Sequence, residues 1–426
     1  MVGLSNRPPR RRASRTTGAL IGAGMLVVSQ LGGVSAAAPA SAAPPASAAA
    51  PASPSMLVVQ ADQPSAVPAY HNWGFDDFFP RALTVAQGST IGFAIEGFHT
   101  ATLLPVATTV AQDNATAGVA APDAEDTTPN PNGTTHLNES IAGLTPLPAT
   151  GCGAPTDPCT FDGTAIVSAG APLSGPPSGA YAVTITAPPG KYVFHCRIHS
   201  QMEGTLDVVA QGGTSTTADE LNAAVQTQIA ADVAAGTTAE AAANTAGHTV
   251  NADGSVTWTL SAGTSSPDGH TVILEMLPVS VAIAPGDTVV WKAPGHNEVH
   301  TVTFPGELHS DAVPMCENGA VDVPAVPKVN PPQGPFDFAC GSAPPDEIEF
   351  GGGNGVTTIT DPTTVADSGL MANDGEAAAF GAPATAALTS WSASFTGAAP
   401  GLYTYVCQIH NNMQGTILIP GPRPTS

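Results

Sequence analysis

The sequence predicts an all-β protein made of two tandem sandwiches, joined by a linker that contains one short helix. Charged residues make up only 11% of the 426 residues, whereas Gly and Pro number 45 and 42. Such a composition is typical of short strands separated by many turns. Residues 183–187 and 391–395 alternate apolar and polar side chains, as half-buried strands do. A nine-residue phrase also occurs twice, which indicates an internal duplication.

The N-terminal segment has the pattern of an export signal. Five Arg residues between positions 7 and 15 precede an apolar run over 18–34, and Val34-Ser-Ala36 offers a cleavage site. The apolar run is short for a spanning helix, so an uncleaved membrane anchor is the less favoured alternative. Residues 1–36 are therefore predicted to be a signal peptide. We expect a secreted or extracytoplasmic protein of a bacterial cell envelope, with no membrane span after the signal is removed.

The duplication and changes in composition set the other boundaries. Residues 37–55 are almost only Ala, Pro and Ser, which favours a disordered or semi-extended linker. The first domain is expected over residues 56–210 and the second over residues 248–420. Residues 211–247 form the linker between them, and residues 421–426 form a tail.

The linker between the domains contains a helical pattern. Apolar side chains recur every four residues over 217–235, and either Thr217 or Asp219 could begin a helix there. We expect the apolar stripe to pack on one of the two sandwiches. The stripe consists of Leu221, Val225, Ile229 and Val233.

The duplicated phrase contains metal-binding side chains. It reads CRIHSQMEG at 196–204 and CQIHNNMQG at 407–415, and the related phrases FHTAT and VHTVT occur upstream at 98–102 and 299–303. Two His, one Cys and one Met are the ligands of a blue-copper site that transfers electrons. The candidate ligands are His99, Cys196, His199 and Met202 in the first domain, and His300, Cys407, His410 and Met413 in the second.

This ligand set suits copper that changes oxidation state. Thiolate and thioether sulfurs are soft ligands that suit Cu(I), and imidazoles serve both Cu(I) and Cu(II). With four protein ligands, no position is left for a substrate, so we expect outer-sphere electron transfer and no catalytic residue. Cys and Met also pack well in apolar cores, but this alternative does not explain the same spacing in two copies.

The strands around the ligands resemble those of cupredoxins. GKYVFHC at 190–196 and GLYTYVC at 401–407 are similar to the cupredoxin strand that enters the ligand loop, and the C-x2-H-x2-M loop is most similar to that of amicyanin in the plastocyanin-like group. Residues 278–291, and more weakly 81–93, resemble the strand pair before the first His ligand. The resemblance implies Greek-key β-sandwiches, two type 1 copper sites and electron carriage. It also implies that the second His of each site lies near the surface.

One departure from the resemblance concerns the residue after the first His ligand. Many cupredoxins have an Asn there that hydrogen-bonds the thiolate, whereas this sequence has Thr100 and Thr301. A hydroxyl could serve the same purpose. Because such contacts tune a metal site, the substitution bears on the reduction potential.

The other four cysteines fall into two pairs. Each predicted domain has one pair in the long stretch between its first His ligand and its Cys ligand. An oxidising compartment outside the cytoplasm allows disulfides to form. We therefore predict the disulfides Cys152–Cys159 and Cys316–Cys340.

The chain is strongly acidic. It has 34 Asp and Glu against 11 Lys and Arg, and five of the basic residues lie in the predicted signal peptide. This charge excludes nucleic acid as an expected partner and favours a redox partner protein, expected to be basic, because opposite charges speed encounter. Simple solvation in a salty or acidic habitat would explain the same charge.

Two other functions remain as alternatives. Copper nitrite reductases combine two such domains with a catalytic copper. One His ligand of that catalytic copper stands directly before the blue-copper Cys, and His195 stands directly before Cys196 here. Leu104 stands where a second catalytic His is expected, although His296 and His309 are potential recruits, and the H-x-H pairs of multicopper oxidases are absent from the sequence. We therefore predict that His195 points outward from its strand. The second alternative is a copper buffer, which would bind copper with the same ligands but would not need to transfer electrons.

Overall fold

A computed structural model describes most of the chain from Met56 to Gly421. The described residues are 56–97, 99–117, 146–149, 151–170, 180–199, 201–296, 298–306, 326–327, 338–339, 356–368, 371–373, 389–407 and 410–421. All of them belong to one compact unit, Pro54–Ser426. The predicted signal peptide and the Ala/Pro-rich linker lie outside the described residues.

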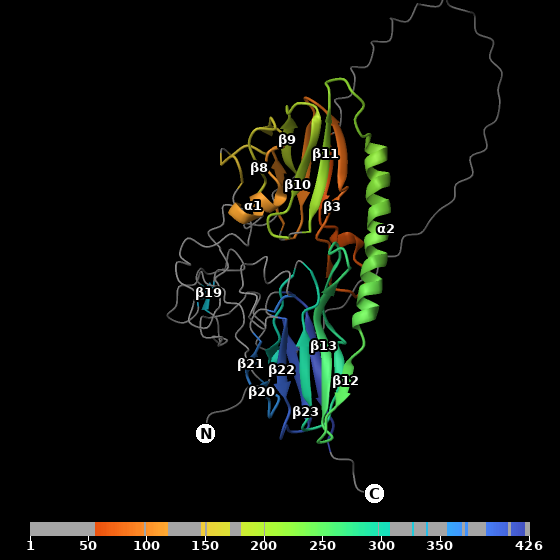
Figure 1. The fold of residues 1–426 in the computed structure, drawn as a ribbon, viewed down its shortest axis with the longest axis vertical. Helices are drawn as coiled ribbons and strands as arrows, with labels where there is room; N and C mark the ends of the chain where they lie inside the picture. The colour runs from red at the N-terminus through yellow and green to blue at the C-terminus, as the bar shows by residue number, and fades with distance from the viewer. Residues whose placement is uncertain are drawn as a thin grey trace, which may run out of the picture. The chain divides into compact units, whose positions relative to one another are not determined.

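The first half of this unit is a β-sandwich of two five-stranded sheets (Figure 1). One sheet contains β1 (Leu57–Ala61), β3 (Phe78–Phe79), β5 (Thr90–Ile95), β7 (Cys159–Phe161) and β9 (Tyr181–Ile185), in the order β3-β1-β5-β9-β7. The other contains β4 (Ala82–Ala86), β6 (Thr102–Leu104), β8 (Val167–Ser168), β10 (Gly190–His195) and β11 (Glu203–Val209), in the order β4-β11-β10-β6-β8.

The second half repeats this arrangement. Its larger sheet contains β2 (Trp73–Gly74), β12 (Gly247–Val250), β13 (Val256–Ser265), β14 (Val272–Leu277), β16 (Thr288–Lys292), β20 (Val356–Thr358) and β22 (Ser390–Ser394). Its smaller sheet contains β15 (Ser280–Ala282), β17 (Thr303–Phe304), β21 (Ala366–Asp367), β23 (Gly401–Val406) and β24 (Gln414–Ile419). A separate pair is formed by β18 (Val326–Pro327) and β19 (Phe338–Ala339).

The strand orders confirm the predicted all-β fold with two tandem sandwiches. The larger second sheet has the order β2-β14-β13-β16-β22-β20, with β12 beside β13, and the smaller has the order β15-β24-β23-β17-β21. In both halves a parallel pair, β1 with β5 and β13 with β16, lies beside an antiparallel third strand. The strand that enters each ligand loop pairs antiparallel with the strand that leaves it. The fold is cupredoxin-like in both halves.

Each sandwich has its own aromatic core. Phe78, Phe93 and Phe194 pack edge to face in the first core. Trp291 packs against Trp391 and other rings in the second. The predicted Cys and Met ligands belong to these same buried clusters, so the ligand loops are anchored in the two cores.

The core also explains the glycine that ends each duplicated phrase. Gly204 pairs across the strands with Phe194, and Gly415 pairs with Tyr405. A Cβ on either glycine would overlap the ring of its partner. Each glycine therefore leaves room for an aromatic side chain two residues before the Cys ligand.

The predicted linker helix is longer than its apolar pattern indicated. Helix α2 covers Ala218–Ala243, and Thr217 caps it in a capping box with Glu220 (Figure 1). The expectation that it packs on one sandwich is wrong. Its first turns place Leu221 and Val225 against the first core, and its last turns pack against β2 and β14. With 26 residues it is about 39 Å long, enough to reach both.

A short strand crosses the predicted domain boundary. Strand β2 lies within residues 56–210, yet it pairs antiparallel with β14 of the second sandwich. Trp73 of β2 packs there with Ile273 and Leu277. Two short helices, η1 (Pro64–Ala66) and α1 (Val110–Ala117), also belong to the first half of the chain. The predicted domain boundaries stay a prediction.

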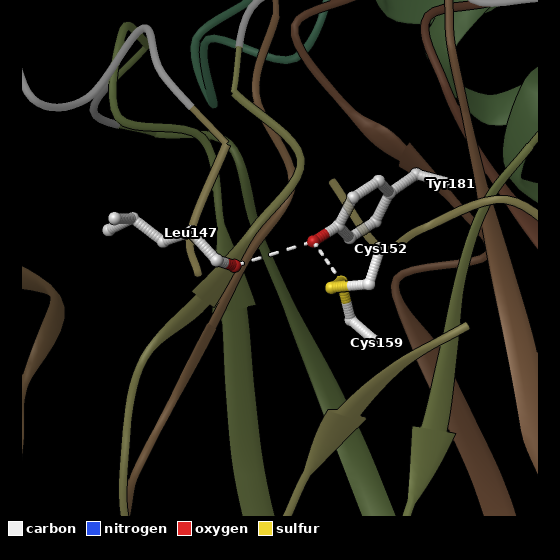
Figure 2. Close-up of a disulfide and its surroundings, with 4 residues drawn as sticks. All are labelled: Leu147, Cys152, Cys159 and Tyr181. Carbon is white, nitrogen blue, oxygen red and sulfur yellow. Dashed lines mark hydrogen bonds between the residues drawn. A yellow bond between two sulfur atoms is a disulfide. The ribbon is translucent and has the colours of Figure 1, made fainter. Parts of the chain in front are cut away.

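The predicted disulfide Cys152–Cys159 is present (Figure 2). The hydroxyl of Tyr181 donates to Cys159 Sγ at 3.0 Å and to the carbonyl oxygen of Leu147 at 3.3 Å, which fixes the loop beside β9. Cys316 and Cys340 lie outside the described residues. In the described part of the chain, no helix is both long and apolar enough to cross a membrane.

Candidate metal centres

The first centre lies at one end of the first sandwich. His99 follows β5 and precedes β6, Cys196 directly follows β10, and His199 lies in the loop to β11. His99 Nδ1 and His199 Nδ1 are 2.9 Å apart, and Cys196 Sγ is 3.6 Å from His199 Nδ1. All three residues are at most 5% exposed. Their ligand atoms lie within 4.8 Å of one another, so they converge on one point.

The second centre repeats this geometry. Ligand atoms of His300, Cys407 and His410 also lie within 4.8 Å of one another. Cys407 Sγ is 3.6 Å from His410 Nδ1, the same separation as in the first centre. His300 Nδ1 is buried and has no hydrogen-bond partner among the described residues. A buried nitrogen without a partner is costly, and a bound metal ion would satisfy it.

The two Met residues are held by the backbone of their loops. Cys196 N donates to Met202 O at 2.9 Å, and Met202 N donates to His199 O at 3.1 Å. The equivalent bonds of Cys407, His410 and Met413 are 2.9 and 3.3 Å. Both Met side chains are almost completely buried in the same core clusters as their Cys. The structure therefore brings the six predicted His and Cys ligands into two equivalent clusters and holds each Met in the same loop as its Cys.

The Thr that replaces the expected Asn does contact the sulfur. The backbone N–H of Thr100 donates to Cys196 Sγ at 3.3 Å, and that of Thr301 donates to Cys407 Sγ at 3.4 Å. The Thr100 hydroxyl lies 3.8 Å from the same sulfur and accepts from Arg197 N at 2.8 Å. Hydrogen bonds of this kind stabilise a thiolate and tune the metal it binds.

Neighbouring charges favour the metal-binding form of each Cys. Burial alone would raise the pKa of Cys196, but the His199 and His99 imidazoles outweigh it and hold that pKa well below its usual range. His410 and His300 do the same for the pKa of Cys407. The thiolate is the form of Cys that binds metal.

Two buried carboxylates near the centres were not predicted from the sequence. Glu298 Oε2 lies 3.0 Å from His410 Nε2, and Glu298 Oε1 lies 4.0 Å from His199 Nε2. Asp76 Oδ1 lies 3.8 Å from His199 Nδ1. A signal exists only for Glu298, which stands two residues before His300, where the first copy has Gly97 before His99.

Glu298 and the imidazoles stabilise one another in their charged forms, whereas burial disfavours the charged form of Asp76. Burial would raise the pKa of Glu298, but His410 and then His199 and His300 lower it to about 2. Burial would lower the pKa of His410, but Glu298 and Cys407 raise it to about 10. The pKa of Asp76 is raised well above its usual range, mainly by burial.

The expectation that the second His of each centre lies near the surface is wrong for the first centre. His199 is only 5% exposed. Its ring faces Asp76 and also Glu298, a residue of the second sandwich, which covers the edge that the resemblance leaves open. His410 is covered in the same way, with 11% of its side chain exposed.

His195 points outward from its strand, as predicted, but its side chain is not exposed to solvent. Phe194 points into the core and His195 to the opposite face of β10, yet His195 is fully buried. Helix α1 covers that face, and Asp113 from this helix bonds His195 Nε2 at 2.8 Å. Arg197 binds the same carboxylate with two bonds of 2.7 Å. Nε2 of His195 is therefore engaged, whereas its Nδ1 is buried and has no hydrogen-bond partner among the described residues.

The other histidines that were considered as recruits do not join this group in the described part of the chain. His296 Nδ1 lies 3.3 Å from Asn373 Nδ2, and its backbone N–H donates to Ser265. His309 lies outside the described residues.

Comparison with known proteins gave structural similarities only. No protein-family model matches the sequence, and no curated protein matches it. A mutant plastocyanin of fern is 17% identical, with 36% of this chain and 99% of that chain covered and a TM-score of 0.17. An auracyanin from Roseiflexus castenholzii is 17% identical, with 36% and 96% covered and a TM-score of 0.20. A copper-containing nitrite reductase from Thermus scotoductus is 12% identical, with 86% and 68% covered and a TM-score of 0.20. At these TM-scores, the fold is defined by the strand orders given above.

Proposed function

We propose that this chain is an exported blue copper protein that carries electrons through two centres, each with two His, one Cys and one Met as ligands. The observation that carries the proposal is the duplicated cluster of His, Cys and His atoms, each beside a buried Met. His99, Cys196, His199 and Met202 would hold one copper, and His300, Cys407, His410 and Met413 would hold the other. Bound copper would supply a one-electron Cu(II)/Cu(I) couple.

The chain's own residues would keep both centres rigid. The two backbone hydrogen bonds in each ligand loop fix Cys, His and Met relative to one another. The N–H of Thr100 or Thr301 orients the sulfur, and the aromatic cores exclude water from the sulfur ligands. A centre held in this way changes little between two oxidation states, and small reorganisation favours fast electron transfer.

The geometry supports a carrier over a nitrite reductase-like enzyme. A catalytic copper would need His195, whose Nε2 is bonded to Asp113 inside a buried ion-pair network. Leu104, at the position expected for a second catalytic His, is buried and lies opposite Val193 in the neighbouring strand. A copper buffer would use the same ligands as a carrier, so the two are separated by reversible redox cycling.

Export and partner choice belong to the same proposal. The basic and apolar pattern of residues 1–36 supports export. The excess of 34 Asp and Glu over 11 Lys and Arg supports a basic redox protein as partner, because complementary charge raises the encounter rate. Salt should then slow electron exchange with that partner.

A copper titration of the purified mature chain tests the function. We expect blue thiolate-to-copper absorption that saturates at two coppers per chain and bleaches and returns reversibly with reductant and oxidant. Cys196→Ser and Cys407→Ser should each remove half of the absorption and leave the other centre intact.

Other results would change the conclusion. A third, colourless copper whose binding is lost in His195→Ala would revive the enzyme. Tight Cu(I) binding without reversible blue colour would indicate a buffer. Absence of copper binding would overturn the proposal.

A further inference from the structure

The outer edges of the two centres face a single carboxylate. Within each centre, Nδ1 of the second His points toward its own Cys sulfur at 3.6 Å, so Nε2 is the outward nitrogen. Nε2 of His410 lies 3.0 Å from Glu298 Oε2, and Nε2 of His199 lies 4.0 Å from Glu298 Oε1. The two oxygens of Glu298 therefore lie between the two imidazoles.

This contact is buried rather than open to a partner protein. The side chains of His199, His410 and Glu298 are 6%, 11% and 18% exposed. The resemblance described above implies that the second His of each site lies near the surface, where a partner protein could reach it. Here the edge of His199 is covered by Glu298 from the second half of the chain, and the edge of His410 is covered by the same residue of its own half. The chain itself therefore occupies the place of the partner.

Other contacts hold the two ligand loops in this arrangement. Asn72, next to β2, donates to the carbonyl oxygen of Asn411, the residue after His410, at 2.8 Å. The same amide donates to Leu274 O at 2.7 Å, and the backbone N–H of Asn72 donates to Glu275 at 2.7 Å. Strand β2 continues this attachment through its pairing with β14. The second ligand loop is thus fixed to the segment that leads to Asp76, beside His199.

We propose that His199, Glu298 and His410 form an internal path through which one electron passes between the two centres. The inference rests on the proposed function, since it needs a copper in each site. One electron leaves the reduced centre and the oxidised centre gains it, so the step consumes no proton and no external reductant. An outside redox protein would supply or remove electrons one at a time, and the pair would share them.

The physical basis is the continuity of the route. The bonds of each imidazole ring lead from Nδ1 to Nε2, a hydrogen bond joins His410 to Glu298, and one short through-space gap separates Glu298 from His199. Removing the carboxylate would replace this route by a longer gap. The side chain also fixes the ring orientation of His410, as partners of metal-binding His commonly do.

The test uses the full copper-loaded chain after a rapid one-electron pulse. A Met413→Leu background sets the two potentials apart, because the axial ligand tunes the potential of such a site. Cys196→Ser and Cys407→Ser provide the spectrum of each single centre. We expect a phase in which absorption moves from one centre to the other at a rate independent of protein concentration.

The decisive variant is Glu298→Ala in the same background. We expect that phase to slow at least tenfold, while Glu298→Gln, which keeps the size and a hydrogen-bonding group, retains more of the rate. Asp207→Asn removes an exposed carboxylate far along β11 from the ligand loop and should leave the rate unchanged. An unchanged rate in Glu298→Ala, or a rate that scales with protein concentration, would overturn the proposal.

A second measurement does not depend on electron transfer. In the diamagnetic Cu(I) form, nitrogen NMR should detect an Nε2–H on His410 that is hydrogen-bonded to Glu298. Glu298→Ala should abolish this hydrogen bond. Its absence in the wild type would overturn the path. Failure of the proposed function itself would be visible earlier and separately, as fewer than two coppers or as no blue absorption before any pulse.

Discussion

Replacing Asp113 is the sharpest test of how the first ligand strand is held. Asp113 is 1% exposed, accepts two bonds from Arg197 and one from His195, and joins helix α1 to the residues on either side of Cys196. Asp113→Asn would leave the Arg197 charge, itself 3% exposed, without its anion. Removing one partner of a buried ion pair typically costs about 3–5 kcal/mol. Because Asn keeps one acceptor oxygen, we expect about 3 kcal/mol.

The pH dependence gives a second, independent magnitude. Burial would raise the pKa of Asp113, but hydrogen bonds from His195 and Arg197 outweigh it and lower the pKa from 3.8 to about 2. A lowered carboxyl pKa means that the folded state binds the proton less readily than the unfolded state. The stabilisation is therefore complete above pH 3.8 and lost as the pH falls through 2. At about 1.4 kcal/mol for each pKa unit, the loss is at most about 2.5 kcal/mol.

Urea denaturation followed by circular dichroism measures both quantities. Asp207→Asn is the matched control, because Asp207 pairs with Lys191 at 2.7 Å on the surface, where the Lys191 side chain is 81% exposed. Exposed pairs contribute less than about 1 kcal/mol. If Asp113→Asn costs no more than Asp207→Asn, or if the acid dependence between about pH 4 and 2 is the same in the variant and the wild type, the buried network does not hold the strand as argued.

Three further outcomes are expected. Gly204→Ala should cost about 1–3 kcal/mol by overpacking against Phe194; a neutral result in urea denaturation would mean that the ring can move aside. Thr217→Ala should cost about 1 kcal/mol through loss of the α2 cap, measured as a lower melting temperature, and a variant as stable as the wild type would show that packing alone fixes the helix start. Replacing Cys152 and Cys159 together by Ala should cost about 2 kcal/mol, whereas a reductant that lowers the wild-type melting temperature should leave this variant unaffected; equal sensitivity in both would place the labile bond elsewhere.

The ligand sets could be predicted from the sequence because their information is local. Cys196, His199 and Met202 share one loop, and the strand that enters it carries an alternating pattern that fixes which side chains point inward. The repeated phrase H-T-x-T upstream of each loop then identified His99 and its counterpart His300. The capping residue of α2 was predictable for the same reason, since Thr217 and Glu220 are three residues apart.

The parts that the sequence did not reveal depend on contacts between distant segments. Asp113 covers His195 across 82 residues, and Glu298 reaches His410 across 112. No periodicity encodes such a meeting, so the burial of His195 and His199 could not be read from their own surroundings in the chain. The attachment of α2 to both sandwiches was missed because one continuous apolar stripe does not show that Leu221 and Val225 pack on the first core while Val233 packs on β2 and β14.

The crossing strand β2 has a consequence for how the protein can be divided. Cutting the chain within α2 would leave the C-terminal fragment without Trp73–Gly74, and so with the edge of β14 uncovered. An uncovered strand edge presents unpaired N–H and C=O groups, which readily pair with another chain. Two separately produced fragments should therefore be poorly soluble alone yet reassemble when mixed, in the manner of split-protein complementation. A gene encoding only one half would not yield a self-sufficient folded protein.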